Sequence, residues 1–175
     1  MESPACASCK TPKAPQSCGI CECSLCRRCA QFLEKHSLTF LEPLPAELGH
    51  RTYCGACYNE KVEPALASYT GNLERAKGVF VYIKGQGEET RLMKRAEKPL
   101  TVLGCTDRAE TLLRLALSAV QGGFNALLDV EIVAAKVRNA GYQTMRWRGT
   151  GVPTRLDGTK LERPLSAMEA IPTSR

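Results

Sequence analysis

The sequence contains only two histidines and one tryptophan, and it has no long apolar run. No uninterrupted apolar stretch approaches the roughly 18–20 residues of a membrane-spanning helix. The start, Met-Glu-Ser-Pro-Ala-Cys, lacks the basic and apolar segments of a secretory leader. Gly85-Gln-Gly87 lacks the strand, glycine-rich loop and helix that surround a nucleotide site. We therefore expect a cytoplasmic protein that neither spans a membrane nor binds a nucleotide through such a loop.

Cysteine, in contrast, is abundant: nine of the ten precede residue 60, and only Cys105 follows. Eight of the nine form four C-x2-C pairs, which we call the first to fourth knuckles: Cys6 and Cys9, Cys18 and Cys21, Cys26 and Cys29, Cys54 and Cys57. In a reducing compartment such pairs bind metal more often than they form disulfides. Eight thiols suffice for two tetrahedral four-cysteine sites, so the sequence predicts two Zn2+ ions per chain.

The spacing of the knuckles predicts which pairs share an ion. Only four residues separate Cys21 from Cys26, a very tight linker if both knuckles closed one site. Interleaving the knuckles avoids this, because the two central pairs then serve different ions. We therefore assign one ion to Cys6, Cys9, Cys26 and Cys29, and the other to Cys18, Cys21, Cys54 and Cys57. Four thiolates leave no open position for water, so we expect structural sites rather than hydrolytic ones.

The formal net charge of +6 counts every cysteine as neutral. Zinc-bound thiols are deprotonated, so eight thiolates and two Zn2+ ions together add about −4 and leave about +2. Overall charge therefore argues little for a nucleic-acid partner. A local basic face consists of Lys10, Lys13, Arg27, Arg28 and Lys35. It balances the negative thiolate sites, or it contacts an acidic partner or a phosphate backbone, and we favour the first interpretation.

The central stretch from Cys18 to Cys29 resembles the FYVE family of zinc fingers, which share its C-x2-C-x4-C-x2-C spacing. The resemblance covers roughly residues 5–60 and implies a treble-clef, cross-brace fold. The family binds phosphoinositides through a basic R-R-H-H-C-R motif and an upstream W-x-x-D. Here Lys13-Ala-Pro-Gln-Ser-Cys18 stands in place of the first, and the sole tryptophan is Trp147, so we expect no lipid headgroup site. The RING spacing fits poorly, because it needs two or three residues in the four-residue gap and normally a histidine ligand.

The pattern of the remaining chain predicts an α+β fold with a mainly antiparallel sheet and one main helix. Asp107 and Glu110 form a capping box ahead of an apolar stripe that ends at Gly122, which predicts the helix. A second, short helix is predicted over 27–36, and a hairpin or extended loop over 38–51. Strands are predicted over 79–84, 100–105, 125–137 and 142–152, the last two joined by a turn at 138–141. We expect domains at 1–64 and 77–155, a junction at 65–76 and a flexible tail at 156–175.

The segment from Gly123-Phe-Asn-Ala-Leu-Leu to Trp147-Arg-Gly-Thr-Gly-Val resembles the YbjQ family of small bacterial proteins. The match runs over about residues 77–155. It implies a bacterial origin, a fold and self-association into a homo-oligomer. The family carries a heavy-metal-binding description, but the resemblance implies no reaction.

These observations favour a non-enzymatic adaptor in which a two-zinc module binds a protein partner and the second domain is a scaffold or oligomerisation unit. The alternative is a metal- or redox-responsive sensor that uses Cys23, the spare thiol between the central knuckles. A ligase-type finger and nucleic-acid binding are lesser alternatives. We expect Cys105 to be a buried apolar residue, Trp147 a core or interface residue, and His36 and His50 to lie on the surface.

Overall fold

The computed structural model describes residues 4–34, 38, 44–85, 93, 97–139 and 141–156 of the chain. The chain divides into two compact units, Met1–Thr70 and Gly71–Arg175, which we describe separately. Within the described ranges, no helix is long and apolar enough to cross a membrane. The tail predicted over 156–175 lies almost wholly outside these ranges, as do His36 and Lys35.

The N-terminal unit contains two small antiparallel strand pairs. Strand β1 (Gln16–Ser17) pairs with β2 (Ser24–Leu25), and β3 (Gln31–Phe32) pairs with β4 (Thr52–Tyr53). A short 3-10 helix, η2 (Ala46–Leu48), precedes β4. The largest fully buried side chains of the described knuckle region are Leu25, Leu48 and Tyr53. Before the fourth knuckle, the described part of this unit has strands of only two residues each and a small apolar core.

The helix predicted over 27–36 is wrong for the part that the structure describes, up to Glu34. Residues 27–29 form a turn, and the chain then enters β3. The Ala30 N–H closes the third knuckle on the Cys26 carbonyl at 3.0 Å, and Gln31 pairs with Tyr53 across the β3–β4 ladder. The knuckle bond is a single helical turn, but the pairing of Gln31 and Phe32 with β4 holds the next residues in an extended conformation. Tertiary pairing therefore overrides the helix-like spacing after Ala30.

The fourth knuckle opens a helical run made of α1 (Gly55–Cys57), η3 (Tyr58–Val62) and α2 (Glu63–Lys77). In η3 the turns are wider: the Glu63 N–H donates to the Tyr58 carbonyl, five residues earlier. Pro64 explains this, because proline lacks an N–H and its ring clashes with the carbonyl four residues before it in a regular helix. The junction predicted over 65–76 lies within α2, and the boundary between the two units falls inside this helix.

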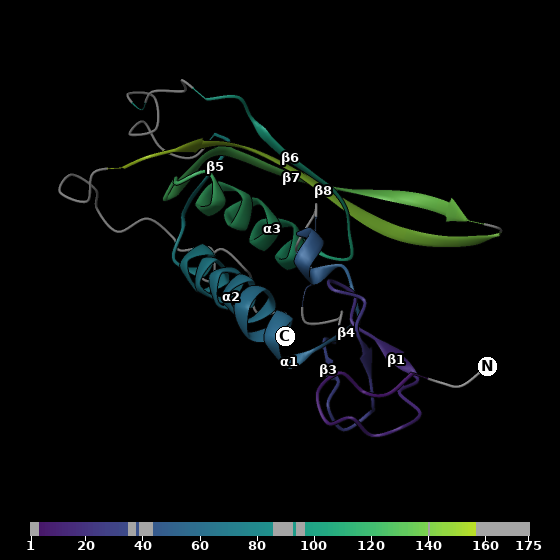
Figure 1. Cartoon of the computed structure of the whole chain (residues 1–175). Helices are drawn as coiled ribbons and strands as arrows, with labels where there is room; N and C mark the ends of the chain where they lie inside the picture. Colours follow the sequence, from purple (N-terminus) through teal and green to yellow (C-terminus); the bar gives the residue numbers. More distant parts are fainter. Residues whose placement is uncertain are drawn as a thin grey trace. The chain divides into compact units, whose positions relative to one another are not determined.

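The second unit is a four-stranded sheet with the order β5-β7-β8-β6. The strands are β5 (Phe80–Ile83), β6 (Leu100–Cys105), β7 (Ala126–Asn139) and β8 (Tyr142–Thr154). Only the β5–β7 pair is parallel; β7–β8 and β6–β8 are antiparallel. Helix α3 (Arg108–Gln121) lies along one face of the sheet (Figure 1). The predicted α+β class, with a mainly antiparallel sheet and one main helix, is confirmed for this unit.

Helix α3 begins where the capping box predicts. The Asp107 carboxylate accepts from the Glu110 N–H at 2.7 Å, while the Glu110 carboxylate accepts from the Thr106 N–H, also at 2.7 Å, rather than from Asp107. Buried side chains cover the inner face of α3: Leu112, Leu115, Ala116, Leu117, Ala119 and Val120. A Cβ on Gly149 of β8 would come within 2.8 Å of the Leu115 side chain, so this glycine permits the close packing of helix on sheet.

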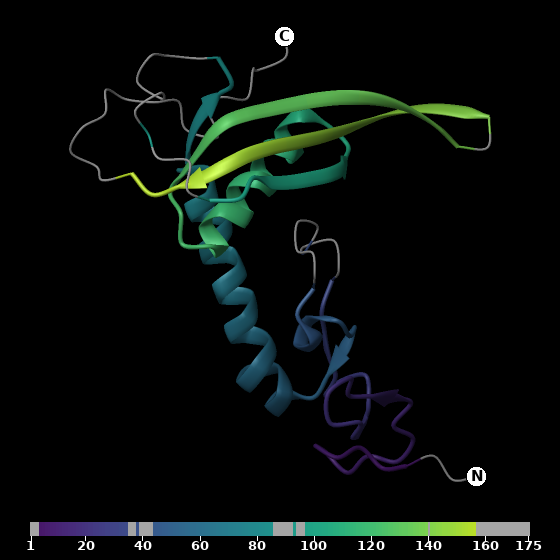
Figure 2. The ribbon, with the colours of Figure 1, turned by 90° about the horizontal axis from the view of Figure 1, so that it is seen from above.

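Strands β7 and β8 continue beyond their neighbours as a two-stranded ribbon. The last β7 residue paired with β5 is Val130, and Trp147 is the corresponding residue of β8 paired with β6. Residues 135–139 and 142–146, which we call the β7–β8 ribbon, pair only with each other in the described structure. Figure 2 shows this ribbon projecting from the rest of the sheet. Strand β7 therefore runs to Asn139, two residues beyond the predicted strand end at Val137 and into the predicted turn.

Candidate metal centres

The structure gathers the first and third knuckles into one group of four sulfurs, the first cluster: Cys6, Cys9, Cys26 and Cys29. These sulfurs lie within 4.8 Å of one another, and Cys9 Sγ is 3.6 Å from Cys26 Sγ. Four sulfurs at about 2.3 Å from a tetrahedral zinc ion lie about 3.8 Å apart, whereas disulfide sulfurs are about 2.05 Å apart. All ten cysteines are free thiols. The spacing therefore suits a tetrathiolate metal site and does not suit disulfides.

A second cluster contains Cys18, Cys21, Cys23 and Cys54, again with all sulfurs within 4.8 Å. Cys21 Sγ and Cys54 Sγ are 3.7 Å apart, the same tetrahedral spacing. Three of its members are predicted ligands, and the fourth is the spare thiol Cys23. The remaining predicted ligand, Cys57, also contacts this group, because its thiol interacts with the thiols of Cys54, Cys21 and Cys18. Five thiols therefore surround the second site.

The two clusters combine the knuckles in the interleaved order. The first cluster joins knuckles one and three, and the second joins knuckle two to Cys54 of knuckle four. This is the cross-brace arrangement that the four-residue gap predicts. The assignment of zinc to these ligands, and of Cys57 rather than Cys23 to the second ion, stays a prediction.

All four knuckles close with the same backbone hydrogen bond. In each, the N–H of the residue after the second cysteine donates to the carbonyl of the first cysteine, at 2.9–3.0 Å: Lys10 to Cys6, Glu22 to Cys18, Ala30 to Cys26, and Tyr58 to Cys54. This turn directs both sulfurs of a pair to one side. Lys10 and Glu22 leave their knuckles in the left-handed region, each with φ of 59°. A residue other than glycine is uncommon there and carries a cost of about 1 kcal/mol.

Backbone N–H groups stabilise the thiolate form of the first cysteine in the first two knuckles. Hydrogen bonds from the backbone of Cys9 and Cys26 lower the pKa of Cys6 to about 6. Burial alone would raise the pKa of Cys18, but the backbone of Cys21 and Cys54 lowers it to about 6. Such thiolates are ready to ligate a metal ion near neutral pH.

The second cysteines of the third and fourth knuckles, Cys29 and Cys57, ionise less readily. Hydrogen bonding with Cys9, then with Cys26, raises the pKa of Cys29 to about 12. Hydrogen bonding with Cys54, followed by burial, raises the pKa of Cys57 to about 12. A metal ion deprotonates such thiols outright, so binding of an ion releases protons from each cluster.

Other residues singled out from the sequence lie outside the clusters. Cys105 is fully buried, as predicted, with its thiol 3.9 Å from the Leu103 carbonyl. His50 is exposed, and its ring meets the ring of Tyr53 edge-on at 6.3 Å. Trp147 is half-buried on β8, at the inner end of the β7–β8 ribbon. The described residues of the local basic face are all exposed: Lys10, Lys13, Arg27 and Arg28.

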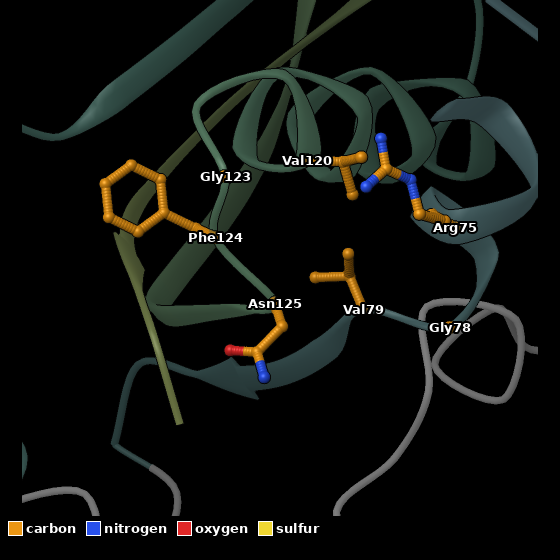
Figure 3. Close-up of a pocket in the computed structure, with 7 residues that line it drawn as sticks. All are labelled: Arg75, Gly78, Val79, Val120, Gly123, Phe124 and Asn125. Carbon is orange, nitrogen blue, oxygen red and sulfur yellow. The ribbon is translucent and has the colours of Figure 1, made fainter. Parts of the chain in front are cut away.

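A hollow of about 310 Å3 in the second unit was not predicted (Figure 3). Its lining is mainly backbone and apolar surface, with Val79, Val120 and Phe124 beside the polar Arg75 and Asn125. The Asn125 amide is already bound to the backbone of Leu156 at both of its polar atoms, and the Arg75 guanidinium bonds to Asn72. The lining contains no acid–base pair and no nucleophile, so the clusters are the stronger candidate site.

The N-terminal unit thus contains two groups of four cysteines that could each hold a metal ion, which is consistent with a two-site zinc-binding module. Comparison with known proteins gave no match to a family model, to a curated protein or to a solved structure.

Proposed function

We propose that this protein is a non-enzymatic adaptor, in which two structural zinc ions hold a protein-binding module and the second unit is a scaffold. The observation that carries the proposal is the pair of closed sulfur clusters. Four thiolates fill the coordination sphere of zinc and leave no place for a reacting water. The FYVE-like spacing of the cysteines favours a treble-clef module, a kind that offers a binding surface rather than an active site.

The small core of the N-terminal unit supports a structural role for the ions. Its described strands have two residues each, and strand pairs this short bury little apolar surface to offset the entropy of folding. In small zinc domains the metal supplies the missing free energy, on the order of 10 kcal/mol per ion. The ions therefore hold the fold of this unit.

The β7–β8 ribbon supplies the contact surface of the second unit. Its side chains at Tyr142 and Met145 are 79% and 47% exposed. The ribbon also carries Lys136, Arg138 and Arg146, and residues 132–148 contain no acidic side chain. A two-stranded hairpin is at best marginally stable alone in water. A protein partner with an acidic surface would both cover its apolar side chains and pair its cations.

Native mass spectrometry of the full chain tests the metal-binding part of the proposal. We expect two zinc ions per chain, bound with release of protons, and one measurement gives both the metal count and the subunit count. A protein that folds and carries one zinc ion or none would contradict the two-site module. Turnover of a substrate with both ions in place would contradict the non-enzymatic assignment.

A photo-crosslinking residue at Tyr142 tests the ribbon as a contact surface. We expect light-dependent adducts in cells, whereas the same residue at Thr101, an exposed position on β6, gives none. The adduct mass distinguishes another protein from a second copy of this chain, which the YbjQ resemblance favours. Equal labelling from Tyr142 and Thr101, or none from Tyr142, contradicts the role of the ribbon.

A second candidate function is a metal- or redox-responsive sensor. The observation that favours it is the position of Cys23, whose sulfur lies among the ligands of the second cluster. In this case Cys23→Ser changes the rate at which zinc is released to a chelator or after a mild oxidant. An unchanged rate removes the support for a sensor and leaves the adaptor intact.

A further inference from the structure

The first two knuckles are copies of one six-residue turn, at residues 6–11 and 18–23. Each contains the C-x2-C pair, then a left-handed residue with φ of 59°, Lys10 in the first and Glu22 in the second. In both, the sixth residue folds back so that its carbonyl accepts from the N–H of the first cysteine. The two distances are 2.9 Å for Cys6 to Thr11 and 3.0 Å for Cys18 to Cys23.

Thr11 and Cys23 therefore occupy equivalent positions in the two clusters. The Thr11 hydroxyl lies 3.1 Å from Cys9 Sγ, within hydrogen-bond distance. Hydroxyl oxygen supports a thiolate ligand there without replacing it. At the same position of the second cluster the chain has the thiol of Cys23, a group that can itself bind zinc.

The geometry of the second cluster points both Cys23 and Cys57 at the same three sulfurs. Cys23 Sγ lies within 4.8 Å of the sulfurs of Cys18, Cys21 and Cys54. The Cys57 thiol interacts with these same three. Zinc takes four ligands in a structural site, so this cluster has one thiol more than an ion needs.

We propose that Cys18, Cys21 and Cys54 form a fixed set of ligands for the second ion, and that Cys23 and Cys57 exchange as the fourth ligand. This inference rests on the proposed two-zinc module and adds a property to one of its sites. The first cluster has four thiols and a threonine, so each of its cysteines is indispensable. The second site keeps its ion when either exchanging thiol is removed or chemically modified.

Metal counts of matched cysteine variants test this redundancy. We expect Cys57→Ser and Cys23→Thr each to keep two zinc ions per chain in native mass spectrometry, and the double variant to keep one. The matched control is Cys29→Ser. Cys29 is the second cysteine of the third knuckle, as Cys57 is of the fourth, and its loss from the four-thiol first cluster is expected to leave one ion. Loss of an ion from Cys57→Ser, with two ions in the wild type, overturns the exchange but not the two-zinc module.

A substitution that adds a fifth thiol to the first cluster tests the same inference through a gain of bound zinc. Thr11→Cys should give the first cluster a fifth thiol, so the double variant of Thr11→Cys with Cys29→Ser should regain the ion that Cys29→Ser loses. If the double variant binds one ion while folded, position 11 and its equivalent at Cys23 do not supply ligands. If the wild type binds no zinc at all, the proposed function itself fails.

Alkylation of the zinc-loaded wild type avoids any loss of folding caused by substitution. Cys23 and Cys57 are both partly exposed. With iodoacetamide we expect one adduct per second cluster, distributed between Cys23 and Cys57 but never on both in the same molecule, with both zinc ions retained. Labelling of Cys23 alone would show that Cys57 is a permanent ligand and would overturn the exchange.

Discussion

The two units of this protein solve the problem of folding in different ways. The N-terminal unit places four knuckles around two sulfur clusters and has strands of only two residues. The second unit buries the apolar face of α3 on a four-stranded sheet, with Leu115, Leu127 and Leu128 almost completely shielded from water. In our proposal the first unit depends on metal–sulfur bonds, whereas the second depends on apolar burial.

This difference shows why the two halves respond to different kinds of change. Metal–sulfur bonds are few, strong and dependent on pH and chelators, whereas apolar contacts are many, individually weak and indifferent to both. Damage to one unit should therefore leave the other folded. Trp147, the only tryptophan, lies in the second unit and gives a fluorescence signal for that unit alone.

The largest expected effect is the loss of the N-terminal fold on removal of metal. A strong chelator should remove stabilisation on the order of 10 kcal/mol per ion from this unit, and amide hydrogen exchange should show its protection collapse. The emission of Trp147 and the thermal unfolding of the second unit should not change. Parallel loss of both signals would show that the units do not fold independently.

Truncation of a buried side chain in α3 should destabilise the second unit and leave the N-terminal unit unaffected. Leu115 is fully buried between the helix and the sheet, so Leu115→Ala should destabilise the second unit by about 2–5 kcal/mol. Urea unfolding followed by Trp147 fluorescence measures this change. The zinc content should stay at two ions per chain, and a fall in the metal count would break the separation of the units.

The cap of α3 should give a smaller effect with a defined pH dependence. Asp107→Ala should cost about 1 kcal/mol, because it removes the acceptor for the Glu110 N–H. Burial would raise the pKa of Glu110, but hydrogen bonds from Thr106 and the charge of Arg114 hold it below 4.5. The stabilisation that comes from the ionised Glu110 carboxylate is present above pH 4.5 and is lost as the pH falls through the lowered pKa of the folded state.

Glu110→Gln should therefore reduce the loss of unfolding free energy below pH 4.5, measured by unfolding at several pH values with Trp147 fluorescence as the signal. It should have less effect on the slope at neutral pH. An unchanged acid limb would mean that Glu110 does not stabilise the cap through its charge.

The smallest expected effect is a gain of stability at a knuckle. Glu22 has φ of 59°, a conformation that glycine adopts without steric cost. Glu22→Gly should therefore stabilise the zinc-loaded N-terminal unit by up to about 1 kcal/mol, with Lys10→Gly as the matched change in the first knuckle. Thermal unfolding followed by far-ultraviolet circular dichroism measures both. Destabilisation by either variant would show that the side chain makes a contact that outweighs the strain.

Local sequence signals predicted much of this structure. The capping box at Asp107 and the glycine at Gly122 mark the ends of α3, because both act through bonds to neighbouring residues. The short gap between Cys21 and Cys26 predicted the interleaving of the knuckles, because chain length limits which pairs can meet.

Features that depend on distant partners were harder to predict. The segment after Cys29 has helical spacing but pairs with β4, which lies about twenty residues further along the chain. The position of Cys23 follows from a backbone turn at Glu22 rather than from ligand spacing. The signal that could have located it is the internal repeat: residues 6–11 and 18–23 share C-x2-C, and their sixth residues are threonine and cysteine.

The helix that begins at the fourth knuckle links metal binding to electrostatics. Cys54 caps this helix: its sulfur accepts from the Cys57 N–H at 3.4 Å. The N-terminus of a helix carries about half a positive charge, whereas zinc with four thiolates carries a net charge of about −2. The helix dipole therefore favours the loaded, negatively charged cluster, and the cluster in turn stabilises the first turn of the helix. Binding of zinc to the second cluster and formation of the first turn of this helix are therefore expected to be thermodynamically coupled.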